Sequence, residues 1–123
     1  KLITWNVNAR VAGRRGTQPT QARRVLAGHP DVVALQEVTK SSLPLWRSAL
    51  NDAGFIVIDS FDVAPDQTVL TGRRRYGLLV ASRWALRALP TGEFPVPWPE
   101  RVLSARLSAP SGAVEVHVAH LPA

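Results

Sequence analysis

Residues 31–38 of the 123-residue chain read DVVALQEV, and this stretch gives the strongest indication of the fold. Its nearly continuous apolar character predicts a β-strand that is buried on both faces, inside a sheet covered on either side. The apolar run ends in Gln36 and Glu37. Because a buried carboxylate is strongly unfavourable unless it is paired, Glu37 requires a partner, either a cation or an arginine.

Helices and further strands are predicted on either side of this stretch. One helix is expected from Thr17 as N-cap to Gly28, and a second from Ser41 or Ser42 to Gly54. Each carries an apolar stripe at helical spacing, formed by Ala22, Val25 and Leu26 in the first helix and by Leu43, Trp46, Ala49 and Leu50 in the second. Strands are expected at 2–8, 55–59, 76–82 and 85–89, and a hairpin at 101–108 and 113–121. The pattern predicts a single α/β (α+β) domain with a mixed β-sheet and flanking helices.

Composition narrows the chemistry. The sequence is 46% hydrophobic and 20% charged, which is the balance of a globular domain, and no apolar run is long enough to cross a bilayer. It contains no Cys, so a disulfide framework, a thiolate nucleophile and a Cys-bound zinc are excluded, and any metal must be held by oxygen or imidazole. No secretory signal is visible, which favours the cytoplasm and leaves the compartment open.

Positive charge dominates the sequence. Thirteen arginines and two lysines against nine acidic residues give a formal charge of +6, which favours an anionic partner. A preference for arginine over lysine can equally be a compositional bias shared by all proteins of the source organism. The densest run, residues 73–75, precedes Tyr76 and is either a solvated loop or a phosphate contact in which Tyr76 offers its ring or hydroxyl.

The first predicted strand carries two amides near its end. Alternation places Asn6 and Asn8 on one face of that strand. Amide oxygens and a carboxylate at strand ends suit a hard cation such as Mg²⁺, with Mn²⁺ as the alternative ion, and Asn6 and Glu37 are the candidate ligands. The structural alternative for Glu37 is an ordinary ion pair or the leading acid of a helix.

The C-terminal hairpin predicts a second polar cluster. Alternation points His120 inward and His117 toward solvent. Apolar matching across a loop at 109–112 pairs Leu107 with Val114, Ala105 with Val116 and Leu103 with Val118. The same register sets Arg101 opposite His120, where a guanidinium and an imidazole can form an anion site. The alternative is a core histidine whose ring bonds a backbone carbonyl.

Four stretches together resemble the endonuclease/exonuclease/phosphatase family, which includes relatives of DNase I and exonuclease III. They are LITWNVN at 2–8, PDVVALQEV at 30–38, YGLLVASR at 76–83 and VHVAHLP at 116–122. The resemblance implies a four-layer sandwich of two mixed sheets with helices outside, and metal-dependent attack of water on a phosphoester.

The resemblance also implies roles for individual residues. Glu37 takes the place of the family's metal-binding Glu, and Asn6 that of the Asn which orients phosphate or water near the metal. His120 falls where relatives hold a His or Tyr close to the scissile phosphate, and Arg101 falls near a phosphate contact of some nucleases. Asn8 stands where some abasic-site endonucleases have an Asp.

This sequence departs from the family pattern in two respects. Arg74 stands where DNase I relatives have a Glu that pairs with the histidine. The resemblance also accounts for only the N-terminal half of a family domain, so residues 1–123 are expected to be inactive alone and to associate with a missing C-terminal half or with each other. DNA or another nucleic acid is the expected substrate. The alternatives are a noncatalytic basic nucleic-acid-binding module, a phosphoinositide or lipid phosphodiesterase, and a truncated product without function.

Overall fold

A computed structural model describes residues 1–8, 17–63, 76–90 and 101–121 of the chain. In chain order the elements are β1 (Leu2–Asn6), α1 (Gln18–Ala27), β2 (Val32–Thr39), α2 (Leu43–Asp52), β3 (Ile56–Asp59), α3 (Ser60–Val63), β4 (Tyr76–Ser82), β5 (Leu86–Ala88), β6 (Val102–Ala109) and β7 (Gly112–Ala119). None of the helices in these ranges is long and apolar enough to cross a membrane.

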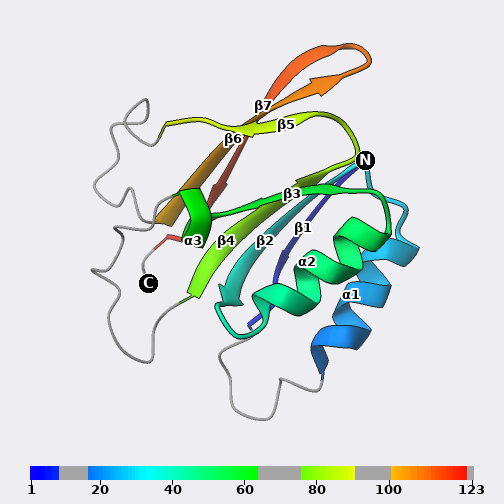
Figure 1. Ribbon diagram of the computed structural model, residues 1–123, viewed down its shortest axis with the longest axis vertical. Helices are drawn as coiled ribbons and strands as arrows, with labels where there is room; N and C mark the ends of the chain where they lie inside the picture. The colour runs from blue at the N-terminus through cyan, green and yellow to red at the C-terminus, as the bar shows by residue number, and fades with distance from the viewer. Residues whose placement is uncertain (9–16, 64–75, 91–100, 122–123) are drawn as a thin grey trace.

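The strands form two sheets that pack face to face. In the first sheet the order is β1-β2-β4-β3, with β1 parallel to β2 and β4 antiparallel to both of its neighbours. The second sheet, β5-β6-β7, is antiparallel. The helices α1 and α2 lie side by side on one face of the first sheet, and the second sheet lies on its other face (Figure 1). The predicted α/β class with a mixed sheet and flanking helices is confirmed.

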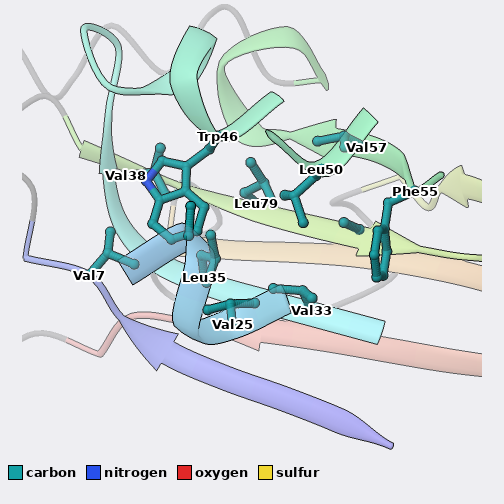
Figure 2. Packing of buried hydrophobic residues seen from close by; sticks show 12 residues of the cluster. Val7, Val25, Val33, Leu35, Val38, Trp46, Leu50, Phe55, Val57 and Leu79 are labelled. Atoms are coloured by element: carbon teal, nitrogen blue, oxygen red, sulfur yellow. The ribbon is translucent and has the colours of Figure 1, made fainter. Parts of the chain in front are cut away.

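The central strand β2 is buried on both faces, as its sequence predicts. On one face Val33 and Leu35 join the helix-side core, where the Trp46 ring from α2 lies near Val7 and Val38 (Figure 2). On the other face Val32 and Ala34 join an inter-sheet core with apolar residues of the two sheets, namely Leu78, Val80, Leu103, Ala105, Leu107 and Val118. The nearly continuous apolar run therefore serves two cores at once.

The helix boundaries follow the predicted signals. Thr17 is the N-cap of α1 and Gly28 its C-cap, while Ser42 is the N-cap of α2. After α2, Gly54 has φ +89°, a left-handed conformation that glycine adopts without steric penalty and that turns the chain into β3.

Several predicted boundaries are wrong by a few residues. The first strand stops at Asn6 rather than Asn8, and the strand predicted at 31–38 spans Val32–Thr39. Residues 60–63, for which the sequence pattern predicts no helix or strand, form α3. The expected four-residue loop at 109–112 is a two-residue turn, because Ala109 already pairs with Gly112.

Two strands that follow each other in sequence, β4 and β5, belong to different sheets. Val114, which alternation places on the same face of the strand as the inward-pointing His120, is 43% exposed on the edge strand β7. The arginine-containing stretch at 9–16, the basic run at 73–75 with Arg74, and the proline-containing stretch at 91–99 lie outside the described residues.

Candidate functional site

The predicted site residues come from one end of the two sheets. The strands β1, β2 and β7 all run toward this end, and β4 begins there (Figure 1). As a result Asn6, Glu37, Tyr76 and His120 lie at the ends of four different strands. We call this the site end of the first sheet, and the opposite end, around Arg83, the tied end.

A β-bulge in β2 directs Glu37. Leu35 pairs with Leu79 and Val38 with Gly77, so Gln36 and Glu37 together oppose the single residue Leu78. Without the bulge, alternation would place Glu37 on the face of Leu35, among the apolar residues under the helices. Val38 takes that position instead and is fully buried in the helix-side core.

The bulge requires an unusual backbone at Glu37, whose φ of +58° lies in the left-handed region. A residue with a Cβ adopts this region at a penalty of about 1 kcal/mol or more. Glu37 is nevertheless only 8% exposed and belongs to a central strand. Such strain in a buried acid is characteristic of functional positions.

His120 is the partner that the structure shows for the Glu37 carboxylate. The imidazole Nε2 lies 3.1 Å from Glu37 Oε1, although the two residues come from different sheets. A carboxylate oxygen only accepts hydrogen bonds, so Nε2 is the ring atom that can donate in this contact. The ring of His120 therefore points inward, as alternation predicts, and bonds a side chain rather than the backbone carbonyl of the alternative interpretation.

Two further contacts position His120, one at its ring and one at its backbone. Tyr76 meets it edge to face, with the ring centroids 4.9 Å apart and an interplanar angle of 84°. The His120 backbone N–H donates to the Arg101 carbonyl at 3.0 Å, which confirms the predicted hairpin register. The imidazole Nδ1 is buried and has no hydrogen-bond partner in the described part of the chain. A buried polar atom of this kind calls for an explanation, and one is a water or ligand at the site.

His117 provides the contrast within the same strand. It is exposed on the outer face of β7, where its Nδ1 lies 2.8 Å from Ser104 Oγ and its Nε2 lies 3.5 Å from Glu115. The prediction that His117 faces solvent is confirmed. The outer pair of Glu115 and His117 has the same chemistry as Glu37 and His120 but is solvent-exposed.

The two asparagines lie beside this cluster. Asn6 pairs in register with Gln36, the neighbour of Glu37 in sequence, and its Oδ1 accepts a 3.1 Å hydrogen bond from the Asn8 backbone N–H. Asn8 has φ +51°, which Asn tolerates better than most residues and which explains why β1 ends early. The described contacts join Glu37, Tyr76 and His120, and they place Asn6 and Asn8 alongside without bonding them to Glu37.

The side chains at the site end offer a small set of oxygen ligands for a metal ion. Among the described residues, there is no cluster of three or more His, Cys, Asp or Glu side chains that could hold one. The possible metal ligands at this end are the buried Glu37 carboxylate and, on the adjacent strand, the Asn6 amide. This fits an ion such as Mg²⁺, which takes one or two protein carboxylates and completes its shell with water and phosphate oxygens.

Sequence reasoning missed the bulge and the pairing of Glu37 with His120. The bulge did leave a signal, because Val33, Leu35 and Val38 share the helix-side core although their spacing breaks the strand period of two. The pairing left none, because it joins residues 83 positions apart through the packing of two sheets.

The comparisons with known proteins agree with this architecture. The model of the endonuclease/exonuclease/phosphatase family matches residues 3–122, and the chain belongs to that family. None of the curated proteins compared matches the chain.

Solved structures share its fold. D. rerio TDP2 complexed with single strand DNA product matches with a TM-score of 0.68 and 15% identity over 99% of this chain and 46% of that one. An AP endonuclease from Archaeoglobus fulgidus matches with a TM-score of 0.65 and 18% identity over 98% of this chain and 40% of that one. The 3'-5' exonuclease NExo from Neisseria meningitidis matches with a TM-score of 0.54 and 25% identity over 94% and 39%. The chain thus spans about half the length of these structures or somewhat less.

Proposed function

We propose that the site end belongs to a magnesium-dependent hydrolase of phosphoester bonds that acts on DNA or another nucleic acid. One observation carries the proposal: a strained bulge places the Glu37 carboxylate against His120 and, through His120, near Tyr76. The proposal is supported by family membership, since the printed description of the family names endonucleases, exonucleases and phosphatases.

A bound divalent ion would be held by the Glu37 carboxylate, with the Asn6 amide oxygen as a second candidate ligand. Mg²⁺ is the expected ion and Mn²⁺ the alternative. The ion would supply positive charge to the nonbridging phosphate oxygens and the leaving oxygen. The residues present fit this role, because Glu37 is buried and fixed by its backbone.

The remaining site residues would contact the phosphate. His120 directs Nε2 toward Glu37, and its ring packs edge to face against Tyr76. Arg101 is held beside His120 by the backbone hydrogen bond, so its guanidinium is a candidate phosphate contact. Asn8 is a further candidate substrate contact. The chain covers 46%, 40% and 39% of the three matching structures, and we propose that the part of the family domain that it does not span supplies the general base and further metal ligands. On this proposal, residues 1–123 alone hydrolyse little or nothing.

Nucleic acid is favoured over lipid phosphodiesters by two observations. The chain carries a formal charge of +6, which suits a phosphate backbone. The matching structures include TDP2 with single strand DNA product, an AP endonuclease and a 3'-5' exonuclease.

The test compares two glutamates in the full-length protein. Mg²⁺-dependent hydrolysis of a single-stranded DNA oligonucleotide should fall at least about 100-fold in Glu37→Gln, the size of effect seen when an electrostatic stabiliser of the transition state is removed. The matched control is Glu115→Gln, which removes the carboxylate of the exposed Glu–His pair and should stay within about twofold of the parent.

Equal turnover by Glu37→Gln and its parent would overturn the assignment of Glu37. Metal-independent, salt-sensitive DNA binding without hydrolysis would instead support the noncatalytic binding module. Turnover of a phosphoinositide but not of DNA would replace the substrate class.

A further inference from the structure

A buried amide network lies behind the site end, on the helix side of the first sheet. Gln18, at the start of α1, is only 2% exposed, and Trp46 of α2 is fully buried. The Trp46 indole Nε1–H donates to Gln18 Oε1 at 2.8 Å. Gln18 is thus a polar side chain enclosed among apolar ones, a position where its amide must be satisfied by specific partners.

The Trp46 contact settles the orientation of the Gln18 amide. An indole N–H only donates, so the Gln18 atom facing it is the oxygen and the amide nitrogen points the other way. That nitrogen donates to the Val7 carbonyl at 3.4 Å and to Gln21 Oε1 at 2.7 Å. Gln21 Nε2 donates to the same Val7 carbonyl at 3.2 Å. Two glutamines from α1 therefore hold one carbonyl at the end of β1.

Val7 connects this network to the site residues on both neighbouring strands. Its carbonyl belongs to the peptide bond with Asn8, and its N–H belongs to the peptide bond with Asn6. The Val7 N–H donates to the Gln36 carbonyl at 3.0 Å, and that carbonyl belongs to the peptide bond with Glu37. Fixing Val7 therefore fixes the backbone that carries the two asparagines and the backbone that enters the bulge.

We propose that Gln18, oriented by Trp46, is a positioning residue for the site: through Val7 it holds the Asn6, Asn8 and Glu37 backbone in register for substrate and metal. The expected effect on catalysis rests on the proposed function. The expected effect on the backbone at Val7 and Asn8 rests on the hydrogen bonds alone. A purely structural role would tie α1 to α2 and affect the whole fold equally. A positioning role predicts a local effect at residues 7 and 8.

The test uses Gln18→Met, which keeps the length of the side chain and removes its amide. The control is Leu50→Val, which trims the same helix-side core without touching the amide network. Backbone amide hydrogen exchange is measured by NMR at Val7 and Asn8 and compared with the Arg83 amide, which donates to the Asp31 carbonyl at the tied end. In Gln18→Met the two site-end amides should exchange about tenfold faster relative to Arg83. In Leu50→Val this ratio should not change.

Kinetics of the full-length protein give the second measurement. Gln18→Met should lower kcat about tenfold or more with little change in KM, because a misplaced reacting group affects the transition state more than binding. An unchanged exchange ratio, or the same ratio in Leu50→Val, would overturn the positioning role. The exchange measurement needs no activity, so its failure is separate from that of the proposed function, which Glu37→Gln tests alone.

Discussion

The two ends of the first sheet handle their polar groups in opposite ways. At the tied end, Arg83 Nε donates to the Pro30 carbonyl at 3.0 Å and Arg83 Nη1 to the Ala53 carbonyl at 3.2 Å. Its guanidinium also lies 4.4 Å from the centroid of the Phe55 ring. One side chain thus joins β4, the start of β2 and the end of α2, and its role is structural.

At the site end the backbone is strained and a buried polar atom is unsatisfied. Glu37 and Asn8 are both left-handed, and His120 Nδ1 has no hydrogen-bond partner among the described residues. His29, near the tied end, is also left-handed, but it lies in an exposed turn after α1. Strain combined with burial, rather than strain alone, therefore distinguishes the end that carries the candidate site.

Of the substitutions that separate the two ends, the one at the tied end is expected to lower the free energy of unfolding most. Arg83→Met removes two hydrogen bonds to carbonyls and a cation–π contact, and it should lower the free energy of unfolding by about 1–2 kcal/mol. Hydrolysis by the full-length protein should stay close to the parent rate below the melting transition. Denaturant unfolding and the DNA assay measure the two quantities. A loss of activity in the still-folded variant would show that the two ends are not independent.

A smaller effect tests the strain at Glu37 itself. At an ordinary strand position Gly is less stabilising than Ala, but at a positive φ the order reverses. Glu37→Gly should therefore be about 1 kcal/mol more stable than Glu37→Ala. The control is Ala34→Gly in the same strand, which should destabilise because Ala34 lies in the regular part of β2. If Glu37→Ala is as stable as Glu37→Gly, the backbone at residue 37 is not strained and this part of the interpretation is wrong.

The smallest expected effect concerns pH at the tied end. In a chain that begins at Lys1, the hydrogen bond from the N-terminal α-ammonium of that residue, together with its charge and that of Arg83, lowers the pKa of Asp31. Because the folded-state pKa is the lower one, this contribution to stability is present above the ordinary Asp pKa of about 3.9 and is lost as the pH falls through the folded-state value. Asp31→Asn should slightly flatten the acid limb of the stability curve and leave neutral stability almost unchanged.

Local patterns predicted much of the fold. The apolar run of β2, the caps of α1 and α2 and the register of the β6–β7 hairpin all depend on residues close in sequence. The bulge was missed because a continuous apolar run predicts a strand buried on both faces without showing which residue points to which face. The early end of β1 was missed because Asn8 adopts a left-handed turn that a strand pattern does not show.

The sequence predicted which residues belong to the candidate site, but it did not predict that Glu37 and His120 contact each other. Alternation pointed His120 inward, and the burial of Glu37 demanded a partner. That these two requirements satisfy each other depends on how two sheets pack, which no local pattern encodes. The metal and substrate roles of these residues stay predictions.

The proposal that the Glu37 carboxylate binds a divalent ion can be tested by locating the bound ion. Mn²⁺, a paramagnetic substitute for Mg²⁺, is titrated into ¹⁵N-labelled protein, and line broadening is compared between the two ends of the first sheet. The backbone amides of Glu37 and His120 should broaden first, that of Arg83 should not, and Glu37→Gln should abolish the effect. Equal broadening at both ends, or unchanged broadening in Glu37→Gln, would contradict the assignment of the buried carboxylate as the metal-binding group.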